Sequence, residues 1–150
     1  MKVSGSYTLA IPQDRAYALL QDPAILGRCM PGCEGLEKIG PDEYAMKMKM
    51  ALAAVSGSFD GKVTITDQQP PTSFRLNVEG KGKIGWMKGG GLLTLSPANS
   101  TTNVQYEGDV QVGGTIAAVG QRLIDTTAKM LIKRFFDKLA TEATASNAGS

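Results

Sequence analysis

The chain has no histidine, only two cysteines and no long apolar run among its 150 residues. Without histidine it lacks the commonest general base, the commonest metal ligand and the usual switch that titrates near neutral pH. A membrane-spanning helix needs about 20 apolar residues, and no window of the sequence approaches this. Apolar and polar residues alternate at the amino terminus, whereas a signal peptide has a continuous apolar run. We therefore expect a cytoplasmic protein that does not use histidine chemistry.

The chain also lacks a large excess of either positive or negative charge. The net charge is only +2, and the 16 basic residues are dispersed along the chain, so we expect no nucleic-acid partner. Cys29 and Cys33 cannot complete a four-ligand zinc site without histidine or further cysteine. Their spacing is not the C-x-x-C of disulfide exchange, so two packed thiols are favoured over a redox pair. We expect no metal.

The strongest helical pattern runs from Gly113 to Ala140. Thr115 is the expected N-cap, and no proline interrupts the residues after it. Steps of three and four place one apolar stripe along this helix at Ile116, Val119, Leu123, Ile124, Ala128, Leu131, Ile132, Phe135 and Leu139. We expect a single domain over residues 1–140 and a flexible tail over 141–150, where small polar residues dominate.

The rest of the chain is typical of strands. Lys2–Ile11 alternates as a first strand, and two short helices are expected near Pro12 and Asp22-Pro23. About six antiparallel strands then follow between Cys33 and Val112. The pattern predicts an α+β fold in which a curved antiparallel sheet of about seven strands wraps around the long carboxy-terminal helix.

Three glycines match the letters of a dinucleotide-binding motif, namely Gly80, Gly82 and Gly85. Such a site needs the motif between a strand and a helix of a parallel unit, and here another strand comes next. Glycine within strands more often marks a bend or a bulge, so these residues predict sheet curvature instead.

No catalytic constellation is evident, because nearly all carboxylates fall on turns or on the face assigned to solvent. The most distinctive feature is the row Met46, Met48 and Met50 on one face of a strand. Methionine specifies a rigid core poorly and adapts well to a deformable pocket. A solid core and a ligand pocket are lined by the same residue types, so both interpretations stay open.

Several motifs together give the chain a family resemblance. They are Asp22-Pro23, the turn from Cys29 to Cys33, Gly57, Gly61, Pro71, the Gly80–Gly91 run, Thr102, Tyr106, Gly113-Gly114 and Phe135-Phe136. This combined pattern resembles the carbon monoxide dehydrogenase G-subunit family of the START-like, helix-grip (Bet v 1-like) superfamily. The likeness covers Val3 to Ala140 and implies an incomplete barrel that encloses an apolar cavity.

The resemblance implies a non-catalytic accessory of aerobic molybdenum carbon monoxide dehydrogenase, linked with its membrane attachment or maturation. Combined with the cavity, it suggests a protein that carries an isoprenoid quinone (menaquinone or ubiquinone) or a lipid between the enzyme and the membrane. The expected ligand-binding residues are Tyr44, Met46, Met48, Met50, Phe59, Leu76, Trp86, Leu93, Tyr106 and Leu123.

Other interpretations compete with the carrier. A maturation or recruitment factor would act by protein contact and need no ligand. A cavity enzyme of the cyclase or hydrolase type would need inward polar groups, which the pattern supplies poorly. Lys129, Lys133 and Lys138 would meet anionic headgroups if the protein sits peripherally on the inner face of the membrane, although an ordinary solvated helix face is favoured for them.

Overall fold

The computed structural model describes residues 1–52 and 55–148 of the chain, and side chains within 1–49 and 57–144. In chain order the elements are β1 (Lys2–Leu9), α1 (Gln13–Leu19), α2 (Pro23–Cys29), β2 (Cys33–Gly40), β3 (Glu43–Leu52), β4 (Val55–Gln69), β5 (Ser73–Gly82), β6 (Gly85–Ala98), β7 (Thr101–Gly113), the 3₁₀ helix η1 (Gly114–Val119) and α3 (Gln121–Ala148).

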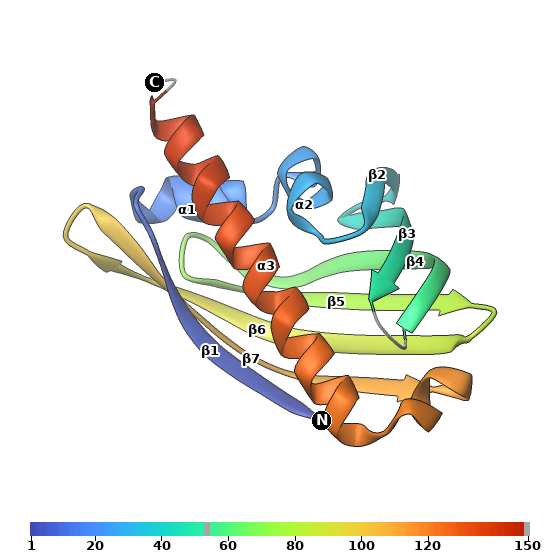
Figure 1. Cartoon of the computed structure of the whole chain (residues 1–150). Helices are drawn as coiled ribbons and strands as arrows, with labels where there is room; N and C mark the ends of the chain where they lie inside the picture. The colour runs from blue at the N-terminus through green and yellow to red at the C-terminus, as the bar shows by residue number, and fades with distance from the viewer. Residues whose placement is uncertain (53–54, 149–150) are drawn as a thin grey trace.

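The strands form one antiparallel sheet in the order β1-β7-β6-β5-β4-β3-β2. Consecutive strands from β2 to β7 are neighbours, and β1 pairs with β7 at one edge. The sheet curves around α3, which crosses its concave face, while α1 and α2 cover one end (Figure 1). The predicted fold, with seven strands, two early helices and a long last helix, is confirmed.

The two short helices begin where the sequence predicts. Pro12 precedes α1 in an extended conformation, and its carbonyl accepts from the amide of Ala16 at 2.9 Å. Asp22 caps α2, since its carboxylate accepts the amide of Ala24 at 2.9 Å, and Pro23 occupies the first helical position. The helix α2 then ends at the turn that contains Gly32, as predicted.

The long helix differs from the prediction at both ends. Residues Gly114–Val119 form the separate 3₁₀ helix η1, and Gly120 has a positive φ of 99°, so α3 begins only at Gln121. Thr115 is therefore not its N-cap. At the other end α3 continues past Ala140 to Ala148, and Ala143 is fully buried. The predicted flexible tail from Thr141 is thus helical over most of its length.

The motif-like glycines lie in the β5–β6 hairpin. Gly82 pairs with Gly85 across the turn, and Gly85 has a φ of 141°, which favours glycine. A strand comes after the motif, as predicted, and the geometry of a dinucleotide site does not form.

The best-packed part of the core lies at the end covered by α1 and α2. Fully buried side chains gather there from β1, the residues on either side of α1, α2 and the second half of α3: Leu9, Ile11, Leu20, Leu26, Leu139 and Ala143. The guanidinium of Arg28 in α2 contacts the Glu142 carboxylate of α3 at 3.0 Å. We refer to this region, where α1, α2 and the second half of α3 meet, as the closed end.

Candidate functional site

An apolar groove lies between α3 and the sheet, away from the closed end. Its volume is about 250 Å³. Its walls come from inward positions of the sheet, from the loop after α2 and from the middle of α3. The apolar lining side chains are Val3, Met30, Pro31, Met46, Met48, Leu76, Val78, Met87, Leu93, Val110, Leu131, Ile132, Phe135 and Phe136.

Glycines form the floor of the groove. Gly89, Gly91 and Gly108 occupy inward positions of β6 and β7, where other residues would project side chains, and Gly91 faces Gly108 in register. A Cβ atom at Gly108 would lie 2.5 Å from the Gly90 carbonyl oxygen, so only glycine fits there. A Cβ atom at Gly89 would meet nothing closer than 3.4 Å, so this position can accept a side chain.

Methionines form much of the wall. Met30, Met46, Met48 and Met87 line the groove, which makes four of the seven methionines in the chain. Met46 and Met48 are 3% and 8% exposed, so they also belong to the core. Because methionine is unbranched and has several rotatable bonds, a wall of this kind can adapt to occupants of different shape.

An aromatic stack closes the β1 side of the groove. The Phe136 ring stacks on Tyr7 at 4.2 Å and on Tyr106 at 5.5 Å between ring centroids. Phe135 meets Phe136 edge to face at 5.2 Å. Burial, and to a lesser extent the neighbouring Tyr7, raises the pKa of the Tyr106 phenol above its ordinary value. Tyr106 is therefore a neutral hydrogen-bond donor at physiological pH.

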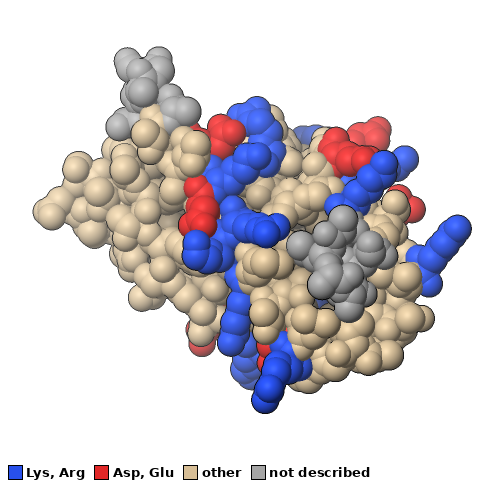
Figure 2. Space-filling model, in the orientation of Figure 1, with Lys and Arg blue, Asp and Glu red and all other residues tan. Residues whose placement is uncertain are grey.

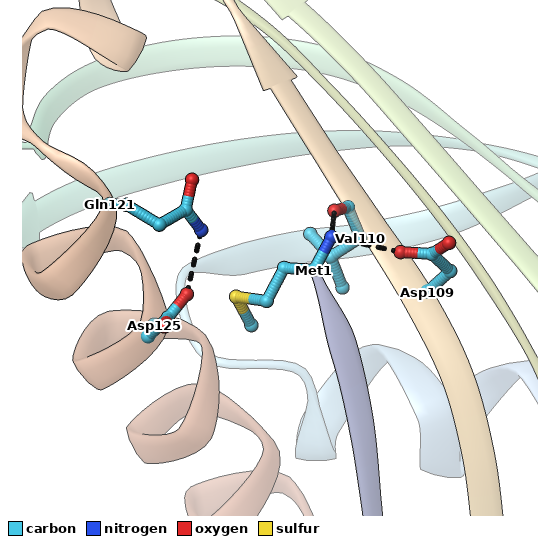
Figure 3. Close-up of polar contacts among 5 residues, drawn as sticks. All are labelled: Met1, Asp109, Val110, Gln121 and Asp125. Atoms are coloured by element: carbon cyan, nitrogen blue, oxygen red, sulfur yellow. Dashed lines mark hydrogen bonds and ion pairs between the residues drawn. The ribbon is translucent and has the colours of Figure 1, made fainter.

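The amino terminus lies beside the groove, next to the start of α3. The Met1 ammonium contacts the Asp109 carboxylate and donates to the Val110 carbonyl oxygen, both at 3.0 Å. The Met1 side chain extends toward the first turns of α3, where Gln121 donates to Asp125, whereas the Asp109 carboxylate lies on the side away from α3 (Figure 3).

The structure brings half of the predicted site residues together. Met46, Met48, Leu76, Leu93 and Tyr106 all line the groove. Ligand binding by these residues stays a prediction.

Two predicted residues belong to the core instead. Tyr44 and Phe59 point inward and are 7% and 2% exposed, but neither lines the groove. The side chain of Met50 lies outside the described residues.

Two other placements are wrong. Trp86 is 43% exposed, and its ring packs over Gly113 on the outer face of the sheet. Counting back from the buried Leu95 and Leu93 in steps of two reaches Met87, so period-two alternation places Trp86 outward. Leu123 lies in the first turn of α3, which starts later than predicted, and does not line the groove.

Sequence reasoning missed several lining residues, and some of them had a signal. Alternation alone identifies Met87. The pair Phe135-Phe136 stands out as a motif, but the predicted helical stripe includes only Phe135, whereas Phe136 is the buried ring at 4% exposure. Met30 and Pro31 have no periodic signal, because they lie in a loop whose position depends on the tertiary fold.

Among the residues described around the groove, none points a carboxylate or thiol side chain into it. Glu107 and Asp109 border it, but their side chains alternate to the outer face, and no group of acidic or cysteine residues in the described part of the chain could hold a metal ion. Cys29 and Cys33 are both free thiols. Burial is the main cause that raises the pKa of the Cys29 thiol, which disfavours the nucleophilic thiolate. The arrangement is suited to binding.

Comparison with known proteins gives the family of the chain. The family model described as the G-subunit of carbon monoxide dehydrogenase (CoxG) matches residues 5–144. The chain belongs to the CoxG family. The family description names a subunit of carbon monoxide dehydrogenase. No curated protein matches the chain.

Solved structures confirm the fold of this CoxG family member. A conserved protein from Geobacillus kaustophilus is 36% identical, with a TM-score of 0.93 over 97% of each chain. A START superfamily protein from Mycobacterium smegmatis is 12% identical, with a TM-score of 0.71 over 96% of this chain and 97% of that one. The Zhui aromatase/cyclase from Streptomyces sp. R1128 is 12% identical, with a TM-score of 0.65 over 96% and 93% of the two chains. The last two show the START-like fold alone.

Proposed function

We propose that this protein is a non-catalytic accessory of molybdenum carbon monoxide dehydrogenase that binds an isoprenoid quinone or a lipid in the groove under α3. The observation that carries the proposal is an apolar groove of about 250 Å³ in a member of the CoxG family. Apolar walls with few polar groups are typical of sites for hydrophobic ligands. Oxidation of carbon monoxide releases electrons that a membrane quinone pool can accept, so a quinone carrier would connect the two.

The size of the groove limits what it encloses. Its volume, about 250 Å³, is slightly below the about 300 to 1,000 Å³ of typical small-molecule pockets. A ring and a short length of chain would fit, while a long prenyl tail would extend past the methionine wall or displace it. Each buried methylene contributes about 0.8 kcal/mol, so a partly enclosed chain still gives useful affinity.

Contact with a membrane would use the outer side of α3. Figure 2 shows Lys and Arg side chains in a band that follows this helix, and its exposed basic residues are Arg122, Lys129, Lys133, Arg134 and Lys138. Lys133 binds Asp137 at 2.7 Å, which neutralises part of the band. Each remaining basic residue near an anionic surface would contribute at most about 1 kcal/mol, so this contact is weak and reversible. Within the described residues, no helix has both the length and the apolarity to cross a bilayer.

The first test asks whether the groove is loaded. Protein purified from a quinone-producing host is extracted with organic solvent, and the extract is analysed by mass spectrometry. The protein is also titrated with menaquinone and ubiquinone carrying short tails. A stoichiometric quinone or lipid in the extract, or saturable binding of an added one, supports the carrier. An empty groove that binds neither compound would leave recruitment by protein contact as the function.

The second test fills the groove. Gly89→Val adds a branched side chain where the nearest atoms of the structure leave room for a Cβ atom, and valine is favourable in strands. We expect binding to weaken by about tenfold or more, since each 1.4 kcal/mol of lost affinity is a factor of ten. Gln111→Val is the control, because it adds valine to the exposed outer face of β7.

A charged residue in the wall gives an independent check. Met48→Lys should abolish loading, because a buried ammonium in an apolar wall is costly. Circular dichroism confirms that each variant is folded. Loading that persists in both Gly89→Val and Met48→Lys would show that the ligand binds elsewhere.

A further inference from the structure

One inward side chain of the groove carries a polar atom. Among the lining residues that the structure describes, every other one that projects from the sheet, α3 or the loop after α2 toward the groove is apolar or glycine, whereas Tyr106 presents a phenol. A single donor in an otherwise apolar site can fix the orientation of a ligand and distinguish it from others.

The position of Tyr106 depends on a glycine in the neighbouring strand. Tyr106 in β7 pairs with Gly5 of β1 on one side and with Leu93 of β6 on the other. Its hydroxyl oxygen lies 2.8 Å from the position that a Cβ atom of Gly5 would occupy, so the ring lies across the glycine. Its ring plane is 17° from that of Phe136, which holds the phenol in place from the helix side.

The hydroxyl of Tyr106 bonds to no other group in the part of the chain that the structure describes. Tyr17, in contrast, lies in the closed end and donates to the Ser73 carbonyl oxygen at 3.0 Å. The Tyr106 side chain is half-buried, so its donor is partly withdrawn from water and still open to a ligand. A hydrogen bond formed in such a place contributes net affinity. The phenol therefore favours occupants that bring an acceptor oxygen to the β1 side of the groove.

We propose that the Tyr106 hydroxyl selects a flat ring that bears a carbonyl oxygen over a hydrocarbon of the same shape. The carbonyl oxygen would accept from the phenol, while the ring would lie against the stack that Phe136 forms with Tyr106. This inference rests on the proposed function, because it names the group that recognises the ligand in the same groove. Tyr106 is a specificity-determining residue in this view, and no covalent step is involved.

The test compares two probes and two variants. Menadione carries ring carbonyl groups, and methylnaphthalene has the same fused rings without them. Tyr106→Phe removes only the hydroxyl and keeps the stack. Tyr7→Phe is the matched control, because Tyr7 is also a tyrosine stacked on Phe136 but does not line the groove. Affinities for both probes are measured by fluorescence or calorimetric titration.

We expect Tyr106→Phe to weaken menadione binding about three- to tenfold, the usual net value of one hydrogen bond, and to leave methylnaphthalene unchanged. Tyr7→Phe should change neither affinity. Equal weakening of both probes by Tyr106→Phe, or no weakening of either, would overturn the role of the hydroxyl while leaving the proposed function intact. Failure of the wild-type protein to bind menadione would overturn this inference, while the extraction and the titration with tailed quinones decide the proposed function separately.

A measurement on the wild-type protein keeps the inference testable if Tyr106→Phe does not fold. The infrared carbonyl bands of isotope-labelled menadione are recorded free and bound. A hydrogen bond from the phenol lowers the stretching frequency of one carbonyl, so we expect one shifted band and one band close to that in apolar solvent. Two unshifted bands in the bound state would contradict the inference.

Discussion

The two halves of α3 meet the same sheet in different ways. From Gln121 to Phe135 no side chain of the helix is fully buried. Over the next two turns Phe136 is 4% exposed, and Leu139 and Ala143 are completely buried. The part of the helix up to Phe136 covers a groove with a glycine floor, whereas the turns that contain Leu139 and Ala143 are packed against α2 and the end of β1. One helix therefore serves two purposes.

The difference indicates how stability and binding are separated in this fold. A binding region must open, so it is drawn from the less stable parts of a protein. Here the closed end supplies the packing that keeps α3 on the sheet. The groove can then contain empty space and adaptable methionines with little loss in the free energy of unfolding of the domain.

Truncation of one leucine in each half of α3 gives the clearest test of whether the two halves contribute differently to stability. Leu139→Ala leaves a cavity in the closed end, and we expect the free energy of unfolding to fall by about 2 to 5 kcal/mol. Leu131→Ala enlarges a groove that is already open and should cost less than half as much. Urea unfolding followed by circular dichroism measures both. Equal losses would mean that the two halves of α3 are packed alike.

A buried hydroxyl tests how tightly the closed end is sealed. Thr102 is fully buried and donates to the Ile11 carbonyl oxygen at 2.7 Å. Thr102→Val keeps the shape but leaves that carbonyl unpaired, so we expect a loss of about 1 to 3 kcal/mol in urea unfolding. Thr101→Val is the control, because Thr101 makes a similar bond to Ala98 at 2.7 Å near solvent. If the free energy of unfolding falls no more in Thr102→Val than in Thr101→Val, water already reaches the closed end.

The smallest effect is expected beside the groove, where Asp109 binds the Met1 ammonium at 3.0 Å. The hydrogen bond to the ammonium, followed by its charge, lowers the pKa of Asp109 in the folded protein. A lowered folded pKa stabilises the protein above the ordinary aspartate pKa and ceases to do so as the pH falls through the lowered value.

Asp109→Asn should therefore reduce the unfolding temperature slightly at neutral pH and have no effect in strong acid. Thermal unfolding of both proteins across this pH range measures the difference. A gap that widens in acid would contradict the sign of the pKa shift.

The fold could be predicted largely from local signals. Alternation identifies the strands, and the Asp22-Pro23 pair locates α2 because a side-chain cap and a proline act within one turn. The start of α3 could not be located in this way. Residues Gly114–Val119 continue the helical apolar pattern, but the amide of Ile116 bonds to the Ile84 carbonyl oxygen at 2.7 Å, a contact with a distant strand.

The site was less predictable than the fold. A pocket forms where side chains are missing, as they are at the glycines of β6 and β7. In the sequence, however, these glycines indicate curvature of the sheet and not the floor of a groove. The aromatic stack joins β1, β7 and α3, which are far apart in the sequence, so no local pattern indicates it. The prediction for Trp86 fails because its register, and not its aromatic character, decides which face it occupies.

The facing pair Gly91 and Gly108 has a consequence for anyone who wishes to redesign the ligand preference of this protein. Because Gly108 tolerates no substituent, the base of the cavity is fixed at this pair together with the backbone path of the two strands. Engineering for larger molecules must therefore begin with the methionine side chains that line the groove around this pair. Their exchange for smaller residues would change capacity without touching main-chain geometry.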